Sequence, residues 1–173
     1  AGDLIVVEFT RFEHERVGAG SRGSHTGWAA RTAQDVVRPI VAWVQGGIAM
    51  RASGFGTALT CLDGRTHESV VRWMRTAFGL AYVDLVTEPG PVRMLPLAAW
   101  EMDRMFHVRR LTPFSVEVHG SRHIAVVGHE DCAANRVSKE HHWEQIRESA
   151  LLVASWGLGA RVVGLWLDSQ GSV

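Results

Sequence analysis

Residues 124–127 read Ile-Ala-Val-Val, and the polar stretch Gly-His-Glu-Asp-Cys follows directly at 128–132. A short, continuous apolar run is typical of a strand in a parallel sheet, where helices bury both faces. Three more segments have a strand-like character: residues 56–61 (GTALTC), 82–86 (YVDLV) and 161–167 (RVVGLWL). We therefore predict four strands, with the one at 124–127 buried on both faces.

Helical patterns lie between these strands. Apolar residues recur at helical spacing in 66–78 and 138–156. Residues 95–107 and 112–119 also read as helices, the second beginning with a threonine cap and a proline. Residues 88–91 (Glu-Pro-Gly-Pro) are expected to continue neither a sheet nor a helix. This alternation predicts an α/β domain over residues 54–173, with a parallel-sheet core flanked by helices.

Residues 1–53 are expected to form an N-terminal arm or extension. Residues 4–10 (LIVVEFT) are compatible with a strand, and residues 32–44 with a helix that Pro39 interrupts. Two interpretations stay open: the segment is an arm that packs on a partner subunit, or it is an upstream extension of a chain that starts at Met50.

The charge balance restricts the partners that the chain is expected to have. The 173 residues include 18 basic and 18 acidic side chains, so the formal net charge is zero. This balance argues against a nucleic-acid partner and against an anionic membrane surface. No run approaches the roughly 20 apolar residues of a spanning helix, and the N-terminus lacks the features of a secretory signal. We therefore expect no membrane partner and a cytoplasmic location.

Two cysteines and one histidine stand at the carboxyl ends of two predicted strands. Cys61 ends the strand at 56–61, and His129 and Cys132 follow the strand at 124–127. In open parallel sheets, ligands bind at this edge. Two thiolates and one imidazole are a common zinc set, and three protein ligands leave a fourth position open, as catalytic zinc requires. We predict that Cys61, His129 and Cys132 hold Zn²⁺.

Asp63 and Arg65 lie beside the first of these ligands, in the stretch Cys-Leu-Asp-Gly-Arg at 61–65. An arginine keeps a paired aspartate ionised, so that the carboxylate can accept a hydrogen bond from a nucleophile at the metal. We predict that Asp63 orients the nucleophile and that Arg65 holds Asp63. The alternative is that the two residues only brace the turn.

The pattern Cys-x-Asp-x-Arg followed by His-x-x-Cys resembles the β-class carbonic anhydrases. Within them, the chain looks most like a group of short carbonic-anhydrase-like proteins. Supporting segments are CLDGR (61–65), VDLVTEPGP (83–91), SRHIAVVGHEDCAAN (121–135) and VVGLWLD (162–168). The resemblance implies the same zinc ligands and Asp–Arg pair, hydration of carbon dioxide to bicarbonate, and a homodimer or higher homo-oligomer.

Two departures from the family pattern keep other functions open. The family usually carries an Arg-Asn-x-Gly-like segment where this chain has Thr-Glu-Pro-Gly at 87–90, and Ala133 follows Cys132 where a glycine is common. One alternative is an enzyme that hydrolyses carbonyl sulfide or carbon disulfide with the same metal set. Another is a non-catalytic zinc-binding module on the same fold.

Other polar residues near the strand ends are expected to have structural roles or none. His67 is expected to lie in solvent rather than to shuttle protons, and Glu88 and Asp168 are expected to cap turns. His141 and His142 fall on the early part of the last predicted helix, and we expect both to be solvated.

Overall fold

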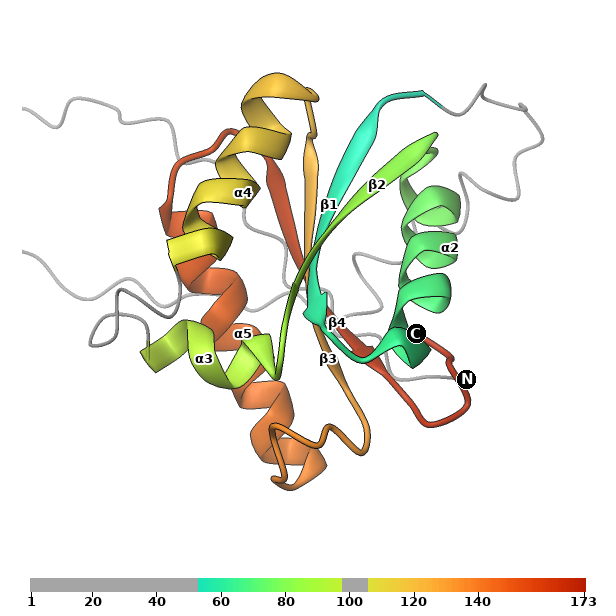
Figure 1. Ribbon diagram of the computed structural model, residues 1–173, viewed down its shortest axis with the longest axis vertical. Coiled ribbons are helices and arrows are strands. Elements are labelled where there is room, and N and C mark those ends of the chain that lie inside the picture. The colour runs from blue at the N-terminus through green and yellow to red at the C-terminus, as the bar shows by residue number, and fades with distance from the viewer. Residues whose placement is uncertain (1–52, 98–105) are drawn as a thin grey trace, which may run out of the picture.

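The computed structural model describes residues 53–97 and 106–173, so the strand and the helix expected within residues 1–53 lie outside the described residues. A parallel sheet forms the centre of the described part (Figure 1). Its strands are β1 (Phe55–Cys61), β2 (Tyr82–Glu88), β3 (His123–His129) and β4 (Arg161–Leu167). Their order across the sheet is β2-β1-β3-β4, and all neighbours run parallel. The four predicted strands and the α/β class are confirmed.

The register of the sheet determines which residues meet at its carboxyl edge. Cys61, the last residue of β1, pairs with Glu88 of β2. The pairing of β1 with β3 ends earlier, at Leu59 and Val126, whereas β3 stays paired with β4 as far as His129. The ends of β1 and β3 are therefore neighbours that no longer bond to each other, which leaves room between them.

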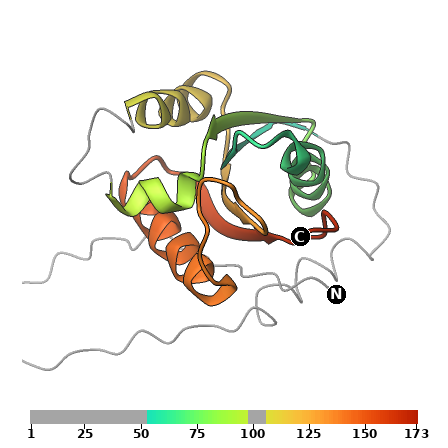
Figure 2. The same cartoon turned by 60° about the horizontal axis from the view of Figure 1, so that its bottom comes forward.

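Helices cover both faces of the sheet (Figures 1 and 2). One face carries α2 (His67–Phe78), whose Val70 and Met74 are buried against the sheet. The helices on the opposite face are α3 (Pro91–Leu97), α4 (Phe106–Val118) and α5 (Lys139–Ser155). Because each strand is covered on both sides, nearly all residues of β1, β3 and β4 are buried.

The helices between β2 and β3 differ from the sequence prediction. Pro91 was expected to continue neither a strand nor a helix, but it begins α3. Proline is tolerated there because the N–H groups in the first turn of a helix make no hydrogen bond within the helix. The predicted helix over 95–107 begins too late, since α3 spans Pro91–Leu97, and its residues 98–105 lie outside the described part of the chain.

The next helix also begins earlier than predicted. α4 starts at Phe106, with Thr112 buried and Pro113 inside the helix. Pro113 removes the hydrogen bond to the carbonyl of Arg109, and this loss is tolerable because Arg109 is exposed to water. The prediction that Thr112 and Pro113 begin a helix is therefore wrong.

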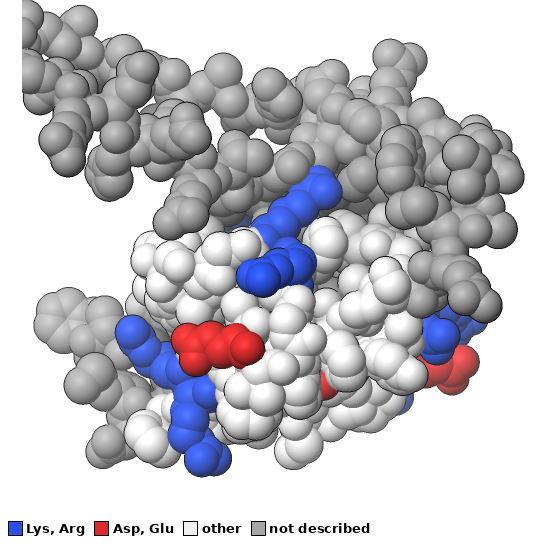
Figure 3. All heavy atoms as spheres, turned by 90° about the horizontal axis from the view of Figure 1, so that it is seen from above, with Lys and Arg blue, Asp and Glu red and all other residues white. Residues whose placement is uncertain are grey.

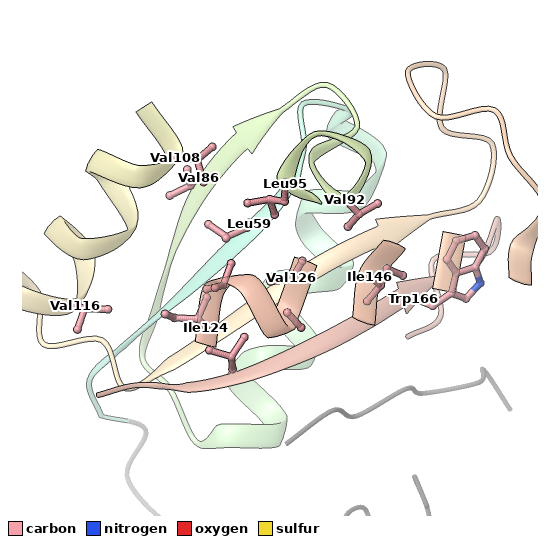
Figure 4. Packing of buried hydrophobic residues seen from close by; sticks show 13 residues of the cluster. Leu59, Val86, Val92, Leu95, Val108, Val116, Ile124, Val126, Ile146 and Trp166 are labelled. Carbon is pink, nitrogen blue, oxygen red and sulfur yellow. The ribbon is translucent and has the colours of Figure 1, made fainter. Parts of the chain in front are cut away.

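The larger of two core clusters lies between the sheet and the three-helix face (Figure 4). Ile146 of α5 is fully buried there, close to Gly128 of β3. A Cβ at Gly128 would lie 2.7 Å from Cδ1 of Ile146, a distance that non-bonded carbons do not adopt. Glycine thus lets α5 pack closely over β3, one residue before His129.

On the face seen from above, a few basic and acidic side chains stand among uncharged residues (Figure 3). Among the described helices, none combines the length and apolar character needed to cross a membrane.

We expect Ile146→Ala to lower the free energy of unfolding by about 2–5 kcal/mol, because it opens a cavity under β3. Leu151→Ala, on the same helix at a side chain that is 38% exposed, is the matched control and should change it by about 0.5 kcal/mol or less. Urea denaturation of both variants measures the difference. Equal losses would contradict the packing described here.

Candidate metal centre

Three potential metal ligands converge at the carboxyl edge of the sheet. Cys61 is the last residue of β1, His129 is the last residue of β3, and Cys132 lies in the turn that follows β3. One ligand atom from each residue lies within 4.8 Å of the others, and all three residues are buried. The structure thus brings together the three residues that the sequence singled out from positions far apart.

The two sulfur atoms have the spacing of a metal site. Cys61 and Cys132 form no disulfide, and their Sγ atoms are 3.9 Å apart. An ion bound tetrahedrally at a Zn–S distance of about 2.3 Å would hold two sulfurs about 3.8 Å apart. The observed separation therefore fits such an ion without rearrangement of the thiols.

His129 presents a nitrogen toward the same point. Its Nδ1 lies 2.8 Å from the carbonyl oxygen of Glu130, which can only accept a hydrogen bond, so Nδ1 carries a proton. Its Nε2 is buried and has no hydrogen-bond partner among the described residues. A backbone carbonyl on one nitrogen commonly orients a histidine whose other nitrogen binds a metal. This buried nitrogen without a partner is therefore consistent with a metal ligand.

The two thiols share a proton in the metal-free protein. A hydrogen bond from Cys132 holds the pKa of Cys61 well below its ordinary value, against the opposing effect of burial, and backbone N–H groups of Gly90 and Asp63 add to the lowering. The same hydrogen bond to Cys61, together with burial, raises the pKa of Cys132. One sulfur is thus a thiolate and the other a thiol.

His129 also tends to hold a proton. Burial alone would lower its pKa, but the facing Cys61 sulfur raises the pKa above its ordinary value. Because metal ligands must be deprotonated, a metal entering this site has to displace the protons that Cys132 and His129 hold.

The predicted Asp63–Arg65 pair is formed. Oδ1 of Asp63 accepts hydrogen bonds of 3.0 Å from the backbone N–H and from Nε of Arg65, and Oδ2 accepts one of 2.5 Å from Nη2. These bonds hold the pKa of the Asp63 carboxyl well below its usual range. The Asp63 side chain is 23% exposed and that of Arg65 is 71% exposed, so the carboxylate lies partly buried under an arginine that faces solvent.

The turn that carries Asp63 is braced by threonines that the sequence analysis did not single out. Residues 64–66 form a short 3₁₀ helix, and Oγ1 of Thr66 donates a 2.9 Å hydrogen bond to the carbonyl of Asp63. Thr60 and Thr66 are both buried, and their hydroxyls are 3.2 Å apart. No sequence motif marks this contact, because it depends on how the turn folds back on β1.

The loop that carries His129 and Cys132 is tied to the C-terminal turn. The backbone N–H of Glu130 donates to the carbonyl of Leu167, and its carboxylate accepts a 2.9 Å bond from the N–H of Ser169. Asp168 caps that turn as predicted, since its Oδ1 accepts from the backbone N–H groups at positions 170 and 172. Glu130, the first residue after β3, is therefore anchored to the C-terminal turn by both its backbone and its side chain.

His142 was predicted to be solvated, but it is buried, with 3% of its surface exposed. Its ring packs edge-on against Trp166 at 5.0 Å, and its Nε2 lies 3.0 Å from Nδ2 of Asn135. Burial lowers the pKa of His142 to about 4, so the ring is neutral at physiological pH. The sequence does contain a signal for the burial of His142. It lies four residues before the buried Ile146, and residues four apart share a helix face.

The prediction that Glu88 caps a turn is wrong. Its carboxylate lies 2.7 Å from Nδ1 of His107, the second residue of α4. Its backbone carbonyl accepts a 3.0 Å hydrogen bond from the N–H of Leu62. The residue therefore joins β2 both to α4 and to the turn after β1, a tertiary role that local sequence does not reveal.

Two further histidines, His141 and His67, were both predicted to lie in solvent, and only the first does. His141 is exposed as predicted and lies 3.3 Å from Glu144. His67 is not simply in solvent: it is partly buried, and its Nε2 lies 3.0 Å from the carbonyl oxygen of Cys61.

The fold and this site define an α/β protein with a candidate metal centre at the carboxyl edge of a parallel sheet. Residues 51–173 match the family model described as "Putative carbonic anhydrase", which is more than half of the chain. The protein therefore belongs to this family, and the resemblance to carbonic anhydrases is confirmed.

Solved carbonic anhydrases are among the structures similar to this chain. The carbonic anhydrase from Glaciozyma antarctica is 18% identical with a TM-score of 0.45, and the match covers 81% of this chain and 92% of that one. The carbonic anhydrase from Streptococcus mutans is 19% identical with a TM-score of 0.45, and the match covers 82% of this chain and 94% of that one. No curated protein matches the chain.

Replacing Arg65 by glutamine should raise the pKa of Asp63, because the guanidinium is the main group that stabilises the ionised carboxylate. Carboxyl ¹³C chemical shifts followed through an acid titration measure the change. Arg72→Gln is the control. Arg72 forms an ion pair with Glu68 on the solvent-facing side of α2, so this substitution should leave the pKa of Asp63 unchanged. An unchanged Asp63 titration in the Arg65 variant would contradict the pairing.

Proposed function

We propose that this protein is a zinc-dependent lyase that converts carbon dioxide and water reversibly to bicarbonate and a proton. The observation that carries the proposal is the 3.9 Å separation of the Cys61 and Cys132 sulfurs, with the unpartnered Nε2 of His129 facing the same point. Three protein ligands leave one tetrahedral position open, which is the arrangement of catalytic rather than structural zinc sites.

Cys61, His129 and Cys132 would hold the zinc ion. When bound in a three-ligand site, zinc supplies Lewis acidity that brings the pKa of a water molecule at the open position toward about 7. The buried thiols and imidazole would keep bulk water away from the metal, and the backbone N–H groups directed at Cys61 would stabilise its thiolate.

Asp63 would orient the attacking oxygen. Its carboxylate stays ionised because Arg65 bonds to both of its oxygens, so it can accept a hydrogen bond at all physiological pH values. An oxygen that donates its proton to Asp63 keeps a lone pair directed at the incoming carbon, and such orientation lowers the entropic part of the barrier. Arg65 is then a positioning residue, which holds Asp63 without touching the substrate.

The domain bounds and the oligomeric state are also part of the proposal. Residues 54–173 would form the zinc-binding domain, with residues 1–53 as an arm or extension, and the protein would act as a homodimer or higher homo-oligomer. Analytical ultracentrifugation of the full chain and of a variant that starts at residue 54 tests both statements. A monomer in both cases would contradict the proposed assembly.

Purified protein should contain one zinc per chain and hydrate carbon dioxide in a stopped-flow assay. Cys132→Ser should lose stoichiometric zinc, because serine does not replace a thiolate ligand. Asp63→Asn should keep zinc but lose at least about 100-fold in turnover, since the neutral amide is a weaker hydrogen-bond acceptor than the carboxylate and orients the attacking oxygen less well. Glu68→Gln makes the same chemical change at a side chain that is 89% exposed and should have no effect.

The outcomes separate the alternatives. Full turnover in Asp63→Asn would show that the Asp–Arg pair only braces the turn. Full zinc without any hydration, from neutral to alkaline pH, would favour a hydrolase of carbonyl sulfide or carbon disulfide, or a non-catalytic zinc module. These alternatives are motivated by residues 87–90, which differ from the segment usual in carbonic anhydrases. In this segment Glu88 forms an ion pair with His107.

Zinc binding to the metal-free protein should release between one and two protons near pH 7. The pKa values of Cys132 and His129 are both raised, and both groups must lose their protons to bind the metal. The apparent zinc affinity should therefore rise with pH, by about tenfold per pH unit for each proton released. A pH indicator in weakly buffered solution measures the release, and a release near zero would contradict the shared-proton description of the site.

A further inference from the structure

We propose that His67 is a positioning residue of the metal centre, which holds the ligand Cys61 in place through a hydrogen bond to its backbone carbonyl. This role rests on the zinc site proposed above. It assigns a function to a histidine that the reaction itself does not use.

The contact has a defined direction. Nε2 of His67 lies 3.0 Å from the carbonyl oxygen of Cys61, and a carbonyl oxygen can only accept. His67 therefore donates from Nε2, and the neutral ring is restricted to the tautomer with its proton on that nitrogen. A group that binds the backbone of a ligand fixes where that ligand's side chain begins.

The Cys61 carbonyl needs this donor because of how the sheet opens. Along a strand, successive residues direct their backbone groups to alternate sides, and the N–H of Leu62 bonds to Glu88 on the β2 side. Cys61 therefore directs its carbonyl toward β3. The pairing of β1 with β3 ends two residues earlier, at Leu59 and Val126. His67 supplies the hydrogen bond that a neighbouring strand would otherwise have supplied.

His67 is itself held in position by the fold. It is the first residue of α2, directly after the 3₁₀ turn at 64–66, and it is partly buried. One residue earlier, Thr66 reaches back to Thr60 with a hydroxyl separation of 3.2 Å. Two adjacent contacts, Thr60 with Thr66 and Cys61 with His67, thus each join residues six positions apart and close the turn between β1 and α2.

The closed span contains both kinds of group that the metal centre requires. Cys61 stands at its start, and Asp63 and Arg65 lie inside it. A change in the His67 contact would therefore displace the ligand directly and alter the base of the turn that carries the carboxylate. A residue with this role acts on metal affinity and ligand geometry before it acts on turnover.

The test compares variants that keep or lose the donor. A glutamine side chain can place an N–H close to the position of histidine Nε2, whereas leucine has no donor and asparagine is too short to reach. The variants are His67→Gln, His67→Leu and His67→Asn, with His141→Leu as the control at an exposed histidine that contacts Glu144 rather than the metal site. Competition with a chromophoric chelator gives the zinc affinity, and the cobalt(II)-substituted proteins give the thiolate-to-metal absorption band.

We expect His67→Leu and His67→Asn to bind zinc about 10–100-fold more weakly and to shift the cobalt band, as losses of a group behind a ligand commonly do. His67→Gln should restore most of the affinity and the wild-type band, and His141→Leu should match the wild type. If His67→Leu does not fold, the comparison of Asn with Gln decides the question.

Wild-type affinity in both the Leu and Asn variants, or in Asn alone where Leu does not fold, would overturn the role of His67 while leaving the zinc site intact. A Gln variant as weak as Asn would also overturn it, because ring packing rather than the donated hydrogen bond would then matter. Failure of the wild-type protein to bind zinc would overturn the proposed site itself, and with it the role of His67.

Discussion

The parallel pairing of β1 with β3 is the constraint on which the rest of the structure depends. It places Cys61 and His129 at the same edge of the sheet, although 68 positions separate them along the chain, since 129 − 61 = 68. The pairing also stops at Leu59 and Val126, short of that edge. Adjacent but unbonded strand ends give the ligands both their proximity and the space between them, which a fully paired sheet would not offer.

The opened edge leaves polar groups that must be satisfied, and the neighbouring turns satisfy them. The Cys61 sulfur receives N–H groups from residues 63 and 90, and Glu130 is held by the C-terminal turn. Gly90 can approach this region because a Cβ there would come within 3.2 Å of Ala134. The candidate metal centre is thus supported mainly by backbone groups, and small residues allow those groups to come close.

The sequence predicted the strands, the cluster of candidate metal ligands and the Asp63–Arg65 pair, because each depends on local patterns: apolar runs, and polar residues placed just after them. It did not predict the partners of His67, Glu88 and His142, since each partner comes from another element of the fold. The helix boundaries near Pro91 and Pro113 were predicted wrongly. Pro91 begins α3, where the missing N–H costs nothing, and Pro113 lies inside α4, where the carbonyl that it leaves unbonded belongs to an exposed residue.

The 71 positions between Cys61 and Cys132 have a consequence for how the protein comes apart. An ion held by both sulfurs would act as a cross-link between the first and third strands, and it would close a long loop of the unfolded chain. Opening the centre of the sheet would then require release of the ion, and release would remove the cross-link that resists opening. Loss of metal and loss of structure would become a single event, and chelation would act on this protein as a denaturant.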